Sequence, residues 1–164
     1  MSEKTQVSDG KRAATDPLAG QAADARYKAF NASADPWKVI GTLQYGGDRT
    51  LASTVERVIL DADASQYPGF EKRLLALAAE PACTEAGYGF ICRMLALIAS
   101  PASVAALKGR LADGNEVKAY LTRMVIEQVP GDEALAALRE AAGRAKGREA
   151  EGLAGAVKAR ECGR

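Results

Sequence analysis

Two arginines, Arg93 and Arg123, are the residues of this sequence whose type and spacing best suit recognition chemistry. They lie thirty positions apart, and each stands inside an apolar segment with helical periodicity. If the intervening chain forms one repeating unit, the two guanidinium groups lie in register along one side of the fold. Such groups bind anions, or they bond to carbonyl and carboxylate groups of a neighbouring hairpin. We favour the structural role and identify Arg93 and Arg123 as candidate concave-face or inter-repeat residues.

The three cysteines, Cys83, Cys92 and Cys162, are too widely spaced to indicate a zinc site or a disulfide framework. A nucleophilic thiolate needs a base, a cation or a helix N-terminus to lower its pKa. Cys92 lies in an apolar helical segment and Cys83 at a turn, so we expect both to be buried as small hydrophobic side chains. The sequence therefore predicts no metal site and no cofactor.

The sequence contains no histidine, which removes the usual general base near neutral pH and the commonest transition-metal ligand. Catalysis by Ser-His-Asp, Cys-His or His-Glu-x-x-His sites is therefore excluded. The segment Tyr45–Asp48 is glycine-rich, but it lacks the G-x-x-x-x-G-K pattern of a phosphate-binding loop and is expected to be a turn. Carboxylates such as Glu56 are expected on solvated helix faces. We predict no catalytic residue, and a protein that is not an enzyme.

The charges of the chain are balanced, with 22 basic and 21 acidic side chains and a net charge of +1. This balance provides no field that would attract a phosphate backbone, so nucleic acid is not an expected partner. No segment approaches the ~20 apolar residues of a membrane span, and the polar N-terminus lacks the apolar core of a signal peptide. The sequence as written predicts a cytoplasmic protein, or a periplasmic or secreted one if it is part of a longer chain.

The chain divides into a polar N-terminal tail at 1–34, expected to be disordered or partly helical, and a helical domain at 35–164. The tail lacks an apolar period, although Asp16-Pro17 could begin a short helix. In the domain, apolar stripes at helical spacing alternate with turn signals. Helices are expected after Asp35-Pro36, after Tyr67-Pro68-Gly69 and after Ser100-Pro101. Further helices are expected at 50–63, 84–99, 115–129 and 148–160, and around Leu135 and Leu138. The helix at 84–99 is apolar around most of its circumference and should be the central buried helix.

A repeat of about thirty-one residues relates the second half of the chain to itself. This shift superposes Val104 on Leu135 and Leu107 on Leu138, and it places the turn residue Ser100 on Gly131. Helical hairpins that recur in this way bury a continuous apolar layer only when they are stacked. The expected architecture is therefore all-α, an α-solenoid of three to four stacked helical hairpins.

Several segments of the chain also resemble a known family. They are Tyr45-Gly46-Gly47-Asp48, Ile91-Cys92-Arg93-Met94-Leu95 with Ile98-Ala99-Ser100, Arg123 with Val129-Pro130-Gly131, and Glu133-Ala134-Leu135-Ala136-Ala137-Leu138-Arg139. In order and spacing they resemble the HEAT-like helical repeat modules found in multidomain proteins of planctomycetes and verrucomicrobia. The resemblance covers roughly residues 37–160 and implies a fold. It does not identify a ligand.

The leading hypothesis is a non-catalytic binding or scaffolding module that presents the surface of its repeats to a protein partner or to neighbouring domains. The sequence gives no oligomeric state. The alternative is a HEAT-like nucleic-acid-processing enzyme such as a DNA glycosylase. That alternative calls for a basic face with aromatic residues above it. The near-neutral charge and the position of the sole tryptophan, Trp37, at the start of the domain speak against it.

Overall fold

The computed structural model describes residues 36–163, and this part of the chain is helical, with no strand. The α-helices are α2 (Pro36–Ile40), α3 (Thr50–Leu60), α4 (Tyr67–Ala79), α5 (Glu85–Ile98), α6 (Pro101–Leu107), α7 (Glu116–Gln128), α8 (Asp132–Arg144) and α9 (Gly147–Cys162), with short 3₁₀ turns at Ala64–Gln66 and Lys108–Arg110. The predicted all-α class is confirmed for these residues. The predicted tail at 1–34, with its helix after Pro17, lies outside them.

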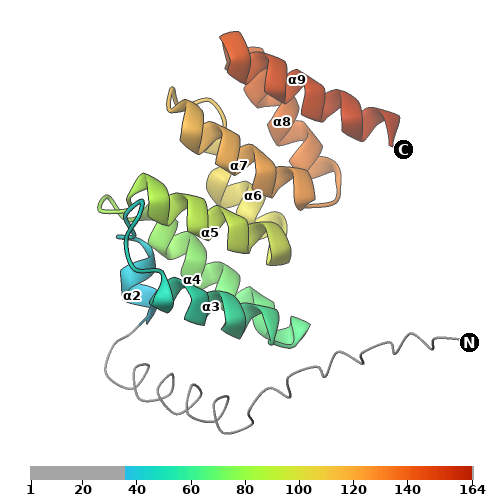
Figure 1. The fold of residues 1–164 in the computed structure, drawn as a ribbon. Coiled ribbons are helices and arrows are strands. Elements are labelled where there is room, and N and C mark those ends of the chain that lie inside the picture. The colour runs from blue at the N-terminus through green and yellow to red at the C-terminus, as the bar shows by residue number, and fades with distance from the viewer. Residues whose placement is uncertain (1–35, 164) are drawn as a thin grey trace, which may run out of the picture. The chain divides into compact units, whose positions relative to one another are not determined.

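The helices form two rows. Figure 1 shows α3, α5, α7 and α9 side by side and running in the same direction, while α4, α6 and α8 run back behind them. Within the front row α5 and α7 share the most extensive contact, whereas α7 and α9 touch less. In the back row α4 contacts α6, and α6 contacts α8. The front row thus has one tight seam, between α5 and α7, and looser ones between α7 and α9 and between α3 and α5.

The helix starts follow from local capping chemistry. Ser100 and Asn115 each accept a main-chain N–H with their side chains, from Ala102 at 3.2 Å and from Lys118 at 3.0 Å. Thr84 does the same for α5, accepting from Gly87 N at 3.0 Å. These bonds satisfy amides that have no partner inside the helix. The predicted starts of α5, α6 and α7 are thereby confirmed.

The buried side chains form two clusters. The first lies among α2, α3, α4 and α5 and includes Leu107, and the second lies among α6, α7, α8 and α9. The predicted central position of α5 is confirmed, since Ile91, Met94 and Leu95 are at most 1% exposed. Helical spacing of apolar residues also predicts burial that the structure contradicts at four positions, where the side chains are exposed to solvent: Val58, Leu97, Val117 and Met124. Each lies on the side of its helix that no other helix covers.

Gly87 lets α5 approach the end of α2. A Cβ at this position would lie 2.5 Å from the carbonyl oxygen of Gly41 and 2.6 Å from that of Ile40. Thr84, one turn earlier, holds the same loop by donating its main-chain N–H to Gly41 O at 2.8 Å and its hydroxyl to Leu43 O at 2.5 Å. A side chain at Gly87 would have to push main-chain atoms that these bonds fix in place.

We therefore expect Gly87→Ala to lower the free energy of unfolding by about 1–3 kcal/mol, as is usual when a packed core is overfilled. This strain outweighs the gain in helix propensity that alanine brings over glycine. The matched control is Gly89→Ala, where a Cβ would meet Leu121 at an ordinary 3.7 Å. That variant should be neutral or more stable, by up to about 1 kcal/mol. Urea denaturation of both proteins makes the measurement, and equal effects would contradict the packing of α5 on α2.

Candidate binding surface

Arg123 lies in the seam between α7 and α9. Its Nε is 3.5 Å from Glu127 Oε1 one turn along the same helix, and its guanidinium lies 5.4 Å from the centre of the Tyr120 ring. The group also packs against Gly152 of α9, where an added Cβ would come within 2.9 Å of Arg123 Cζ. Arg123 therefore connects α7 with α9. It does so by packing, with its ion pair directed to its own helix.

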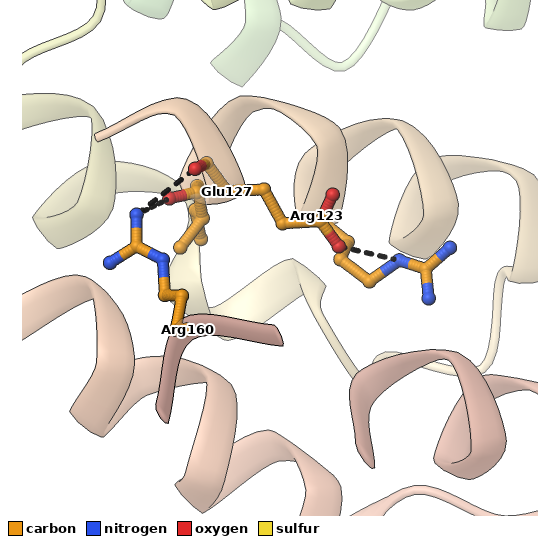
Figure 2. A network of polar contacts seen from close by, with 4 residues as sticks. Arg123, Glu127 and Arg160 are labelled. Atoms are coloured by element: carbon orange, nitrogen blue, oxygen red, sulfur yellow. Dashed lines mark hydrogen bonds and ion pairs between the residues drawn. The ribbon is translucent and has the colours of Figure 1, made fainter. Parts of the chain in front are cut away.

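The hydrogen bonds that we expected from Arg93 and Arg123 are made instead by Arg160 and Arg110. Figure 2 shows Arg160 reaching from α9 to the main chain at the end of α7. Its Nη2 donates to Ile126 O at 3.2 Å, to Glu127 O at 3.0 Å and to Val129 O. Arg110 donates in the same manner to Ala78 O at the end of α4, at 2.9 Å. Both arginines bond to carbonyl groups at the C-terminal end of a helix, where such groups lack partners in the next turn.

Arg93 lies away from Arg123, so the two do not share a site. Arg93 lines a cavity of about 130 Å³ between the start of α3 and α5, together with Arg49. Arg123 lines two cavities of about 180 and 620 Å³ in the seam between α7 and α9. The predicted ladder would require both guanidinium groups on one continuous surface. The structure directs them into separate grooves.

An apolar stripe runs along the outer side of α7. Val117, Tyr120 and Met124 stand at helical spacing there and are 42%, 53% and 38% exposed. The opposite side of the helix is buried through Ala119, Thr122, Val125 and Ile126. Aromatic and methionine side chains are enriched in protein–protein interfaces. With the seam beside it, this α7 stripe is an uncovered apolar surface next to a groove.

The groove beside the α7 stripe has a floor of small residues and a mixed charge. Gly152, Gly155 and Ala156 of α9 line its larger cavity, between the charged groups of Arg123, Arg160, Glu127 and Glu151. The smaller cavity holds Glu149, whose Oε1 is buried with no hydrogen-bond partner within the described chain. Gly155 is exposed in this groove, whereas the guanidinium of Arg123 covers Gly152 and Ala156 is buried.

The one buried carboxylate among residues 36–163 is Glu71, a residue that the sequence did not single out. It is 4% exposed. It accepts the main-chain N–H groups of Ser100 at 2.8 Å and Ser103 at 3.1 Å, and both serine hydroxyls at 2.6–2.9 Å. Burial raises the pKa of Glu71, but these hydrogen bonds outweigh that effect and hold the pKa below its usual value. Glu71 of α4 thus caps α6 and joins neighbouring hairpins.

The predicted burial of Cys83 and Cys92 is confirmed, with 9% and 2% exposure. Burial raises the pKa of the Cys92 thiol to about 12 and raises that of Cys83 as well. Beside Cys92, the Tyr88 hydroxyl shares a 2.6 Å hydrogen bond with Thr122 of α7. Thiols with raised pKa values are poor nucleophiles. This group therefore belongs to the core that joins α5 to α7.

Replacing Arg123 by lysine tests its role in the seam. We expect Arg123→Lys to lower the melting temperature, with a loss of about 0.5–1 kcal/mol at this partly exposed site. Lysine keeps the charge but lacks the flat group that packs between Tyr120 and Gly152. The matched control is Arg148→Lys on α9, because Arg148 has no ion pair or hydrogen bond within residues 36–163. A melting temperature unchanged by Arg123→Lys would show that the guanidinium does not hold the seam.

The described part of the chain contains neither a candidate cluster of metal ligands nor a candidate membrane span. No group of three or more cysteine, aspartate or glutamate side chains there is placed to hold a metal ion. No helix among residues 36–163 combines the length and apolar character needed to cross a bilayer. In comparisons with known proteins, the chain matches no family model, no curated protein and no solved structure.

Proposed function

We propose that this chain is a non-catalytic binding or scaffolding module. It is an α-solenoid of HEAT-like hairpins that presents its front row of helices to a protein partner or to neighbouring domains. The spacing of buried residues supports this architecture. Val104 and Leu135 are both buried, as are Leu107 and Leu138, and each pair is thirty-one positions apart in successive hairpins. Ser100 and Gly131 stand at the equivalent helix starts.

The observation that carries the proposed function is the α7 stripe beside the open seam. Large apolar side chains exposed on one helix carry a cost in water that a partner removes by covering them. The seam contains two cavities, each lined by arginine and glutamate side chains that can make polar contacts. An interface with an apolar centre and a polar rim is the usual composition for protein recognition. We therefore place the partner on α7, along its border with α9.

The test is a comparison of partners captured by three forms of the full chain. The immobilised wild type, the double variant Tyr120→Asp/Met124→Asp and the variant Leu60→Asp are incubated with a lysate of the source cells. Bound proteins are quantified by mass spectrometry. Leu60 is the control, since it is 59% exposed on α3, away from the stripe. Circular dichroism establishes that all three remain helical.

We expect a defined set of proteins to be lost with the double variant and kept with Leu60→Asp. If the captured set does not depend on the α7 stripe, or if both variants lose it equally, the proposed surface is wrong. Retention of duplex DNA by the wild type, falling steeply with salt, would contradict the module and favour a nucleic-acid-processing protein.

A further inference from the structure

The cavity between the start of α3 and α5 has a charge pattern unlike that of the seam between α7 and α9. Its lining contains two arginines and no acidic residue, and the rest of its wall is amide, phenol and apolar: Leu43, Gln44, Tyr45, Arg49, Ala52, Ala86, Gly89, Phe90 and Arg93. By contrast, each cavity of the seam has glutamates beside its arginines. The cavity at α3 and α5 therefore gathers positive charge in a chain whose net charge is nearly zero.

Neither arginine of this cavity is neutralised by the described chain. Among residues 36–163, Arg49 and Arg93 have no carboxylate within ion-pair distance, whereas Arg139 pairs with Glu161, and Arg110 bonds to a carbonyl group. Arg93 is held over the ring of Phe90, with 5.4 Å from Cζ to the ring centre. That contact orients the guanidinium plane and leaves its N–H groups for another acceptor.

Two acidic residues adjoin lining residues in the chain, and each makes a hydrogen bond of its own. Asp48 precedes Arg49 in the chain, but its Oδ1 accepts the main-chain N–H of Thr50 at 2.8 Å and the Thr50 hydroxyl at 2.6 Å. Glu85 accepts the Tyr45 hydroxyl at 3.0 Å. These bonds fix the loop that forms one wall of the cavity, and neither carboxylate lies within ion-pair distance of Arg49 or Arg93.

We propose that this cavity binds a carboxylate of the protein partner, carried by the side chain of a glutamate or aspartate. Guanidinium groups bond readily to the two oxygens of a carboxylate, and both Arg49 and Arg93 line this cavity. The methylene stem of the acidic residue would lie on Phe90, Ala52 and Ala86. The size of the cavity, about 130 Å³, suits the end of one side chain. The inference rests on the proposed function, because it names a chemical feature of the partner.

The experiment is an NMR titration of the full-length chain with N-acetyl-glutamate N-methylamide, a capped amino acid that carries one carboxylate. The observed signals are the main-chain amide of Gly89 and the Nε–Hε groups of Arg49 and Arg93. N-acetyl-glutamine N-methylamide is the neutral control ligand, and inorganic phosphate is the competing anion. The variants are Arg49→Gln and Arg93→Gln, with Arg148→Gln as the matched control, because Arg148 is exposed and lies outside this cavity.

We expect saturable shifts with a Kd on the order of 1–10 mM, as suits a ligand of so few atoms. Arg49→Gln and Arg93→Gln should each weaken binding about tenfold, since hydrogen bonds to charged groups are the strong ones. Arg148→Gln should bind as the wild type does. Shifts that fail to saturate, that persist in both cavity variants, or that the glutamine ligand reproduces would overturn the proposal. So would phosphate binding at these groups with no carboxylate binding.

The two proposals fail separately. If the capped glutamate does not bind but the α7 stripe variants still lose their partners, the binding module stands and the carboxylate site is wrong. If the capped glutamate binds and no protein depends on the α7 stripe, the cavity is an anion site in a protein whose function lies elsewhere.

Discussion

Leu107→Ala is expected to lower the free energy of unfolding by about 2–5 kcal/mol, the usual cost of truncating a buried leucine. Leu107 is 2% exposed. It belongs to the first hydrophobic cluster, although Val104 of the same helix belongs to the second. The short helix α6 therefore links the two clusters, and a cavity at Leu107 removes packing where they meet.

The matched control for Leu107→Ala is Leu97→Ala, because Leu97 is 55% exposed on α5. Its removal should change the stability by no more than about 0.5 kcal/mol. Chemical denaturation measures the free energy of unfolding of the two variants, and the slopes of their unfolding curves are compared. A loss below about 0.5 kcal/mol for Leu107→Ala would place this side chain outside the core.

Glu71→Gln is expected to cost about 2–4 kcal/mol at neutral pH. Hydrogen bonds to a charged group contribute about 1.5–3 kcal/mol, and a buried donor without a partner adds to the loss. The carboxylate accepts from Ser100 and Ser103, whereas the amide nitrogen of glutamine would face those donors. Glu56→Gln, a carboxylate on the partly exposed side of α3, is the control and should stay within about 0.5 kcal/mol of the wild type.

The contribution of Glu71 depends on pH in a definite direction. The folded protein holds the pKa of this carboxyl below the ordinary value of 4.5, so the unfolded chain takes up its proton first as the pH falls. The stabilisation is therefore complete above about pH 4.5 and is lost as the pH drops through the lowered pKa. The wild type should lose stability along this acid limb, and its advantage over Glu71→Gln should shrink. A difference between the two that is constant from pH 7 to pH 3 would contradict the role of the charge.

The sequence predicted the helices of this fold well because their ends depend on neighbouring residues. Ser100 before Pro101 and Asn115 after Gly114 are chemical signals that act within three positions of themselves, and the structure uses both as caps. Apolar spacing was less informative. Leucine and methionine can be buried, but whether Leu97 or Met124 is buried depends on which side of the helix another helix covers.

The candidate sites were harder to predict, because they depend on residues far apart in the chain. Glu71 lies 29 and 32 positions from its serine partners, and each serine read separately is a helix cap or a solvated hydroxyl. A spacing of thirty residues correctly placed Arg93 and Arg123 on the same row of helices. It could not predict which way their side chains point. Arg160 makes the bonds expected of them because it faces the carbonyl groups at the end of α7. Arg49 joins Arg93 only through the fold of the loop before α3.

The looser contact between α7 and α9 also has a consequence for hydrogen exchange. The last hairpin, α8 with α9, touches the rest of the domain through α7, α6 and the 3₁₀ turn at Lys108–Arg110, and Arg160 bonds to the end of α7. A hairpin held by fewer contacts opens at a lower free energy than the body that it rests on. Amide protons of α8 and α9 should therefore exchange through a partial opening that leaves α5 protected. Such an opening widens the groove beside α7, so a partner that binds there would slow exchange in α9 as well.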